Sequence, residues 1–102
     1  MPSQPLYAYR PDVLRALARH GLAPRGTTRP STLRDHLRAL YRFELRRLKA
    51  ALLDGAFSRA AFAPRVAELR QRYALVSLPL ASWVTTPLPP DEAARDQAGP
   101  PC

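Results

Sequence analysis

The sequence predicts a small all-α protein: a three-helix domain with a long central helix, an extended apolar arm after the third helix, and disordered termini. Three observations support this fold class. Apolar residues recur at helical spacing in three segments, residues that favour helix starts precede those segments, and glycines follow the first two. At 102 residues the chain is long enough for one domain at most.

The first predicted helix begins at Pro11 and ends before Gly21. Proline suits the first helical position, and Asp12 complements the positive end of the helix dipole. Gly21 followed by Leu22 is typical of a left-handed C-cap with its hydrophobic contact. Residues 22–30 contain two prolines and a glycine, and we expect them to form a loop. The buried face of this helix should be formed by Val13, Leu14, Leu17 and Ala18.

The central helix should run from an N-cap at Ser31 to Asp54, with Gly55 as its stop. It carries a broad apolar strip and a smaller second one, which indicates neighbours on both sides. The broad strip contains Leu33, Leu37, Leu40, Tyr41, Leu45, Leu48, Ala51 and Leu52, and the smaller one contains Ala39, Phe43 and Ala50. Between the strips lies a basic stripe, stacked along one face at helical spacing: Arg38, Arg42, Arg46 and Lys49.

The third helix should begin at Ser58 or Ala63, with Pro64 in its first turn or at a kink. Its apolar residues recur at amphipathic spacing: Phe62, Val66, Leu69 and Tyr73. Residues 75–84 are largely apolar but contain Pro79, which argues against a helix through their middle. We therefore expect an extended arm that Trp83 anchors on the helices.

Prolines concentrate at the two ends of the chain. Residues 1–9 and 85–102 together hold seven of the twelve prolines, a composition typical of disorder. The sequence therefore predicts a flexible arm over residues 1–9, a basic helical domain over residues 10–84 and a disordered Pro-rich tail over residues 85–102. A folded part of about 75 residues is marginally stable alone, which favours a homo-oligomer or a subunit of a complex.

The predicted domain is far more basic than the tail. Residues 10–75 contain fifteen basic and five acidic residues, whereas the residues after 75 contain one basic and three acidic residues. The formal net charge of the whole chain is +8. A surface this basic attracts polyanions such as nucleic acid, an acidic protein surface or anionic lipid.

We expect neither an enzyme nor a cofactor, because no catalytic constellation can be assembled from these residues. His20 and His36 have no cysteine near them, and a zinc site needs three or four ligands. His20 should lie in the last turn of its helix, and His36 should be partly buried. Cys102 is alone at the end of the chain, and Gly26 lacks the lysine of a phosphate-binding loop.

The carboxylates of the central helix have basic neighbours. Asp35 with Arg38, and Glu44 with Arg47, are three residues apart, so we expect ion pairs on the helix surface and no acid–base dyad.

The compartment is predicted from what the sequence lacks. No apolar run reaches about 18 residues, so we expect no transmembrane helix. The first eleven residues carry one basic residue and no apolar stretch, so we expect no signal peptide and a cytoplasmic location.

These observations favour a non-enzymatic binding module that contacts nucleic-acid phosphates without sequence specificity. The alternative is a protein-binding adaptor that grips an acidic partner with the same helix, or a small structural subunit of a larger complex. Arginine binds phosphate and carboxylate equally well, so the residues leave the partner's identity open. The expected contacts are Arg25, Arg29 and Arg34 around the start of the central helix, and Arg38, Arg42, Arg46 and Lys49 along it.

The segment Leu40-Tyr41-Arg42-Phe43-Glu44-Leu45-Arg46 resembles the signature of the LYR-motif assembly factors. That family consists of small, basic, three-helix mitochondrial proteins that bind acyl carrier protein and help to assemble respiratory complexes. The resemblance implies a location in the mitochondrial matrix and a downstream aromatic at Phe57 or Phe62. The residues that it casts as partner contacts are Leu40, Tyr41, Arg42 and Arg46.

Residues 12–42 are similar in organisation to the helix–extended loop–helix of SAP-type and LEM-type domains, which bind DNA or DNA-associated proteins. This similarity implies phosphate contacts from backbone N–H groups at the start of the second helix. The side chains that it implies as contacts are Arg25, Arg29, Arg34 and Arg38.

Overall fold

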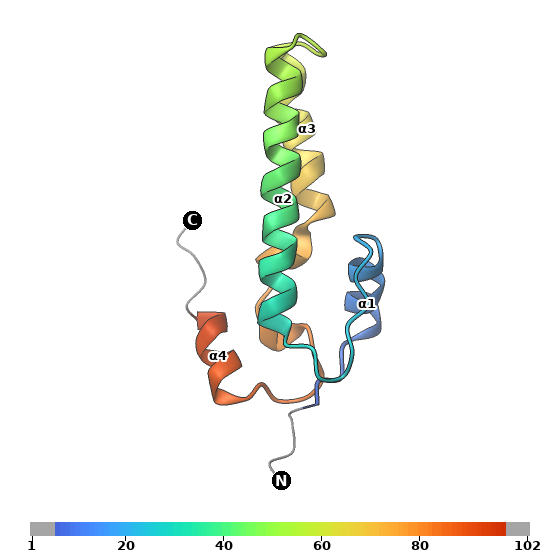
Figure 1. Ribbon diagram of the computed structural model, residues 1–102, viewed down its shortest axis with the longest axis vertical. Helices are drawn as coiled ribbons and strands as arrows, with labels where there is room; N and C mark the ends of the chain where they lie inside the picture. The colour runs from blue at the N-terminus through green and yellow to red at the C-terminus, as the bar shows by residue number, and fades with distance from the viewer. Residues whose placement is uncertain (1–5, 98–102) are drawn as a thin grey trace.

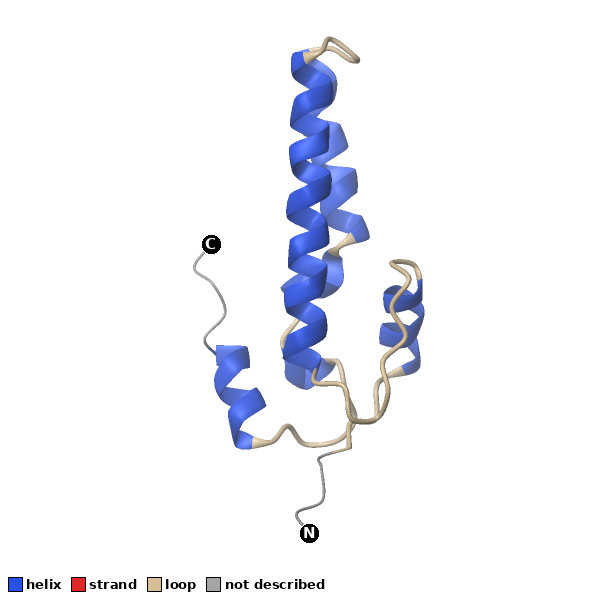
Figure 2. Ribbon diagram, viewed as in Figure 1, coloured by secondary structure: helices blue, strands red, loops and turns tan. Residues whose placement is uncertain are grey.

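The computed structural model describes residues 6–97, which fold into four α-helices (Figure 1). The helices are α1 (Pro11–Ala18), α2 (Pro30–Leu53), α3 (Arg59–Arg72) and α4 (Pro90–Gln97), and two short 3₁₀ turns, η1 (Ala74–Ser77) and η2 (Leu80–Ser82), lie between α3 and α4. Within the described residues the only β-type pairing is one isolated bridge, so loops and turns make up the rest (Figure 2). The predicted all-α class is confirmed.

The helix ends follow the residues that predicted them. Pro11 and Pro30 occupy the first position of α1 and α2, where the missing N–H costs nothing. Gly21 and Gly55 adopt φ of 75° and 76°, a left-handed conformation that glycine reaches without steric cost. After each glycine the next N–H turns back five residues: Leu22 donates to the Leu17 carbonyl and Ala56 to the Ala51 carbonyl, both at 3.0 Å.

The α2–α3 hairpin is the longest feature of the molecule, and α1 and α4 flank only one end of it (Figure 1). α3 begins directly after Ser58, one of the two predicted starts, and it continues through Pro64. Leu69 and Tyr73 of the predicted apolar stripe are buried against the core, whereas Phe62 and Val66 are half-buried farther along the hairpin.

The core lies at the base of the hairpin, where the arm that follows α3, residues 75–84, crosses beneath α2 (Figure 1). Trp83, Leu17, Leu37 and Leu80 are fully buried there, which confirms that Trp83 anchors the arm. The prediction that the arm is extended is wrong: it is folded into η1 and η2, and only the short link of Leu78 and Pro79 between the two turns is extended. The core side chains are Tyr7, Val13, Leu17, Leu33, Leu37, Leu69, Tyr73, Leu75, Leu80, Trp83 and Val84.

The N-terminal segment from residue 6 belongs to the fold, in contrast to the flexible arm expected over residues 1–9. Tyr7 is buried in the core, and its N–H donates to the Gly26 carbonyl at 2.7 Å. Tyr9 pairs with Val84 in the isolated antiparallel bridge, and its hydroxyl donates to the Thr28 carbonyl. Aromatic burial thus outweighs the disorder that the neighbouring prolines predict; residues 1–5 lie outside the described range.

The C-terminal segment corrects the prediction of a disordered tail from residue 85. Residues 90–97 form α4, which packs against α2 and η2. Pro90 begins this helix and two acidic residues, Asp91 and Glu92, follow in its first turn, a favourable start that the high proline content obscured. Residues 98–102, including Cys102, lie outside the described part of the chain.

Glu92 joins α4 to the start of α2. Its carboxylate is fully buried and accepts two hydrogen bonds from Ser31, from the backbone N–H at 3.0 Å and from the hydroxyl at 2.6 Å. The positive end of the α2 dipole favours a negative charge at this position. The prediction of Ser31 as the N-cap is wrong by two residues: Arg29 is the N-cap, α2 begins at Pro30, and Glu92 provides the acceptor from outside the helix.

We predict that Glu92→Gln lowers the free energy of unfolding by about 1–3 kcal/mol, because it removes the charge from buried hydrogen bonds. Urea unfolding followed by circular dichroism at pH 7 measures the change. Asp91→Asn is the matched control, since it removes the same charge one residue earlier from an exposed ion pair of 3.8 Å with Arg29. That control should change stability by less than about 0.5 kcal/mol; equal effects of the two substitutions would contradict the role given to Glu92.

Candidate nucleic-acid interface

The predicted contact residues fall into two groups that lie in different surroundings. Arg25, Arg29 and Arg34 surround the start of α2, where α4 also packs. The other group, Arg38, Arg42, Arg46 and Lys49, follows one face of α2 away from that end. Only the second group forms a continuous row on a single element.

At the start of α2, the carboxylates of α4 occupy the positions that a phosphate would need. The Ser31 N–H is bonded to Glu92, and Asp91 lies 3.8 Å from Arg29. Arg34 Nη1 donates to Asp96 at 3.3 Å, and Nη2 donates to the Arg95 carbonyl at 2.8 Å. The acidic residues of the chain's end thus neutralise the corner that the organisation of residues 12–42 implied as a phosphate site.

The structure corrects the prediction for Arg34. Its side chain is 5% exposed, and its guanidinium is bonded to α4, so it is not available to a phosphate in this conformation. Asp96 also accepts the Leu80 N–H at 2.7 Å, so one carboxylate joins α2, α4 and η2. A buried guanidinium needs such partners, because an unpaired buried charge is strongly destabilising. Arg34 therefore has a structural role: it joins α2 to α4.

Arg25 and Arg29 are exposed, but they lie beside different groups. The backbone N–H of Arg25 donates to the Thr28 hydroxyl at 2.9 Å in a tight turn. The Arg25 side chain is in none of the ion pairs of the described residues. Arg29 is paired with Asp91 across an exposed gap. An exposed pair of this kind contributes little energy and competes weakly with an incoming anion.

Arg38 marks the transition between the two groups. It forms the predicted ion pair with Asp35, 3.7 Å away, and its side chain is 20% exposed. Burial lowers the pKa of the Arg38 guanidinium, and the positive charge of Arg34 lowers it further. Arg38 is therefore partly engaged within the chain and is a weaker candidate contact than the residues that follow it.

Arg42, Arg46 and Lys49 are exposed along α2, and none of the ion pairs within residues 6–97 involves them. Their spacing of four and then three residues places them on one side of the helix, within a length of roughly 10 Å. These three cations form the row that we call the α2 stripe. Its geometry suits several negative charges arranged in a line.

Folding makes the surface more basic than the sequence alone suggests. Of the sixteen lysines and arginines, fourteen are exposed, whereas only five of the eight carboxylates are exposed. The three carboxylates that fold inward, Glu44, Glu92 and Asp96, accept hydrogen bonds or ion pairs from within the chain. The excess of nine cations on the surface therefore exceeds the formal net charge of +8.

The residues of the LYR-like segment divide between packing and solvent. Leu40 and Tyr41 are half-buried, and the Tyr41 ring meets Tyr73 edge-on with centroids 5.6 Å apart. Arg42 and Arg46 are exposed. Tyr41 thus contributes to the contact between α2 and α3, and the two arginines remain free on the opposite side.

Glu44 corrects a predicted pair. Its carboxylate lies 3.7 Å from Arg72 and accepts a hydrogen bond from the Tyr73 hydroxyl, so its partners are on α3 and at the end of α3. Arg47, the expected partner, instead lies 5.9 Å from the centre of the Phe43 ring. The packing of α3 against α2 determines the partners of Glu44, because it brings the Arg72 guanidinium and the Tyr73 phenol to this carboxylate from across the hairpin.

Of the two histidines, His20 packs against other residues and His36 is exposed. His20 stacks on Tyr73 with ring centroids 4.3 Å apart, and its Nε2 lies 2.9 Å from the Arg72 carbonyl. His36, which the sequence placed in a partly buried position, is exposed. It lies on the solvent side of α2 because α3, α4 and η1 pack against other faces of that helix.

Within residues 6–97, no group of three or more His, Cys, Asp or Glu side chains could hold a metal ion. Over the same range, no helix is long and apolar enough to cross a membrane.

No protein-family model, curated protein or solved structure matches this chain. The LYR-like and SAP-like resemblances therefore stay predictions that rest on the residues quoted for them.

The surroundings of the Tyr73 phenol predict a stability that depends on pH. Burial, and then the hydrogen bond to Glu44, raise the pKa of its phenol to about 12, whereas an unfolded tyrosine titrates near 10. The folded state therefore holds a proton that the unfolded state loses between about pH 10 and pH 12, and stability falls as pH rises through that window. Tyr7 and Tyr9, whose pKa values are also raised by burial, act in the same direction.

We predict that Tyr73→Phe reduces the loss between pH 9 and pH 11.5 by about 2 kcal/mol, since the substituted ring has no proton to lose. Urea unfolding at pH 9 and at pH 11.5 measures the loss in each protein. The loss of unfolding free energy that remains in the variant should come from the raised pKa values of Tyr7 and Tyr9. An unchanged difference between the two pH values would show that Tyr73 does not carry the effect.

Proposed function

We propose that the protein is a non-enzymatic binding module that contacts the phosphate backbone of nucleic acid through the α2 stripe of Arg42, Arg46 and Lys49. The observation that carries this proposal is the separation of charge on folding. Three of the eight carboxylates are drawn into the fold while fourteen of the sixteen cations remain exposed, and the α2 stripe has no ion-pair partner within the described residues.

The shape of the stripe supports contact with phosphates and not with bases. It lies on the outer face of a straight helix, and its three cations are spaced along roughly 10 Å of the axis. Long cationic side chains in such a row can reach successive phosphates on one strand, which fixes position without reading sequence.

The number of contacts follows from the residues that stay free. With Arg34 buried and Arg38 partly engaged, the α2 stripe makes about three phosphate contacts, which gives a slope of log affinity against log salt of about −3 for duplex DNA. Micromolar or weaker binding is expected at physiological salt, as for other contacts made by charge alone.

We predict that the triple variant Arg42→Ala, Arg46→Ala, Lys49→Ala reduces the salt slope by about 3, because each lost phosphate contact removes about one unit. Fluorescence anisotropy of a labelled random duplex, repeated at several salt concentrations with the full chain, measures the slope.

The matched control neutralises three other exposed arginines that lie outside the described ion pairs: Arg15, Arg19 and Arg59. Both triple variants lower the net charge by the same amount. The control should change the slope by less than about one unit. If the two variants weaken binding equally, net charge and not the α2 stripe governs the interaction, and the proposed interface is wrong.

A further inference from the structure

The outer half of the α2–α3 hairpin has no hydrophobic core of its own. Residues 38–68 contain no buried side chain, although they include most of α2 and the first two-thirds of α3. The molecule is elongated, 58 × 26 × 20 Å, because this part extends beyond α1 and α4 (Figure 1). Helices of this length owe most of their stability to packing of an apolar face, and here two helices pack only against each other.

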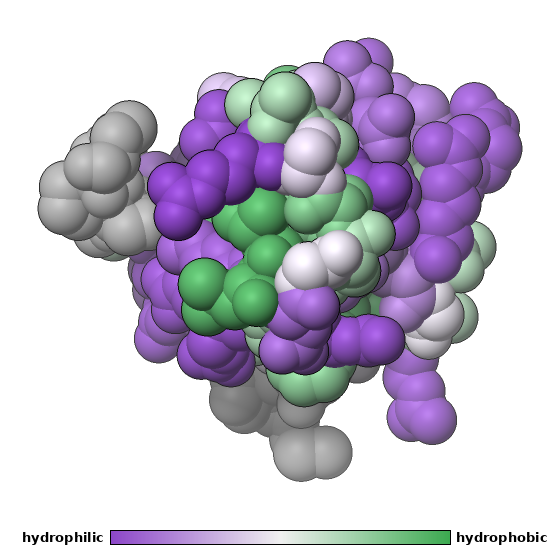
Figure 3. All heavy atoms as spheres, turned by 90° about the horizontal axis from the view of Figure 1, so that it is seen from above, coloured by the Kyte–Doolittle hydropathy of each residue, from purple (hydrophilic) through white to green (hydrophobic). Residues whose placement is uncertain are grey.

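Large apolar side chains are correspondingly exposed on the outer half. Leu53 is 84% exposed and Phe43 is 52% exposed. Viewed from the end where the hairpin turns, hydrophobic residues gather at the centre of the face, with hydrophilic residues around them (Figure 3). The half-buried members of this region are Leu45, Leu48, Leu52, Phe57, Phe62 and Val66.

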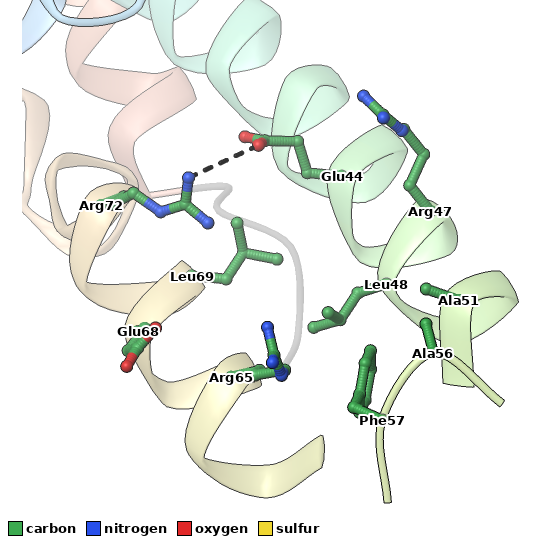
Figure 4. Close-up of a pocket in the computed structure, with 10 residues that line it drawn as sticks. All are labelled: Glu44, Arg47, Leu48, Ala51, Ala56, Phe57, Arg65, Glu68, Leu69 and Arg72. Carbon is green, nitrogen blue, oxygen red and sulfur yellow. Dashed lines mark ion pairs between the residues drawn. The ribbon is translucent and has the colours of Figure 1, made fainter. Parts of the chain in front are cut away.

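A groove of about 460 Å³ opens between the two helices in this region (Figure 4). Its apolar lining comes from both helices and from the turn between them: Leu48, Ala51, Ala56, Phe57 and Leu69. The groove is open along the hairpin and is not an enclosed cavity, a shape that suits a row of apolar side chains from another helix.

Cations stand on both sides of the groove. Arg47 lines it from α2 and Arg65 lines it from α3, where Arg65 lies 4.5 Å from the centre of the Phe57 ring (Figure 4). The carboxylate of Glu44 is already bound by Arg72, as the dashed line in Figure 4 marks, and by the Tyr73 hydroxyl. Arg47 and Arg65 are thus the rim charges left for a ligand, opposed among the lining residues only by Glu68.

We propose that this groove docks an amphipathic α-helix of a partner protein, with an apolar stripe that enters the groove and carboxylates that face Arg47 and Arg65. A third helix completes the packing that two helices leave open, in the manner of helix-in-groove recognition. The segment from Glu44 to Leu53 spans roughly 15 Å, so about three turns of the partner helix would lie on it.

The charge of the hairpin decides between an acidic partner and a second copy of this chain. The charged residues that line the groove are three arginines and two glutamates, and because Glu44 is paired with Arg72, Arg47 and Arg65 are opposed only by Glu68. Two copies joined through this groove would bring like-charged rims together, which costs energy at an interface, whereas an acidic helix meets complementary charge.

This surface is distinct from the α2 stripe. Glu44, Leu48 and Ala51 face the groove, whereas Arg42, Arg46 and Lys49 lie about half a turn away on the other side of the helix. The two surfaces can therefore be disrupted separately, and the docking groove does not depend on the proposed contact with nucleic acid.

The test uses three labelled synthetic peptides of about four turns: a leucine stripe flanked by glutamates, the same stripe flanked by lysines, and a scrambled form of the glutamate peptide. Fluorescence anisotropy measures the affinity of each for the full chain. The glutamate peptide should bind about tenfold more tightly than either of the others, a ratio typical of one or two complementary charge pairs.

Charge reversal in the protein identifies the site. Arg47→Glu with Arg65→Glu should invert the preference, so that the lysine peptide binds more tightly than the glutamate peptide. Arg15→Glu with Arg19→Glu, which reverses two exposed charges on and beside α1, should leave the preference unchanged. Phe57→Ala should weaken the glutamate peptide about fivefold or more, while Leu14→Ala, an equally simple truncation of an exposed side chain at α1, should not.

Three results would overturn the proposal. The scrambled peptide could bind as tightly as the glutamate peptide, or the reversal of Arg47 and Arg65 could leave the preference intact. Sedimentation equilibrium could also show a dimer of the full chain that Leu53→Asp abolishes, which would make a second copy the occupant. Duplex DNA binding is measured on the same variants as a control. If Phe57→Ala leaves DNA binding unchanged, a failure of the groove proposal says nothing against the proposed function of the α2 stripe.

Discussion

The buried carboxylate of Glu92 holds the C-terminal helix of the described chain, α4, to the start of its longest helix. It accepts both the backbone N–H and the hydroxyl of Ser31, so the exposed donors at the start of α2 are satisfied by α4. One turn farther along α4, Asp96 binds Arg34 and the N–H of Leu80. These contacts place η2 beneath α2, and with it Trp83, whose backbone carbonyl in turn accepts the N–H of Arg10 at 3.0 Å. Burial of these carboxylates is tolerated because each is met by charge-assisted hydrogen bonds and, for Glu92, by the α2 dipole.

The same contacts determine which surface remains basic. An anion-binding corner at a helix N-terminus is common in proteins, and the arginines around residue 30 provide the charge for one. Here the acidic residues of α4 occupy that corner, so the free positive charge lies farther along α2 and on the hairpin. The candidate interface therefore depends on α4 without including it, because α4 neutralises one group of cations and leaves the other available.

The hairpin combines two chemically different faces on one helix. Toward solvent, α2 presents Arg42, Arg46 and Lys49; toward α3, it presents leucines that two helices cannot cover completely. Beyond the base, where Leu37 and Leu69 are buried, the seam between α2 and α3 opens into a groove with guanidinium groups on its rim. A module of this shape can hold a polyanion on one side of α2 and an acidic helix on the other, because the two faces share no residue.

The sequence by itself determined the class of fold, the bounds of α1 and α2 within a residue or two, the stops at Gly21 and Gly55, and the anchoring role of Trp83, because these depend on local helix chemistry and on apolar periodicity. It also located the α2 stripe, whose exposure follows from helical spacing. Only the tertiary structure decided that residues 6–9 and 90–97 belong to the fold, that Arg34 is buried, and that Glu44 pairs with Arg72. Each of these depends on partners distant in the sequence, 19 residues apart for Tyr9 and Thr28 and 62 for Arg34 and Asp96, and local patterns carry no information about which distant group a side chain will meet.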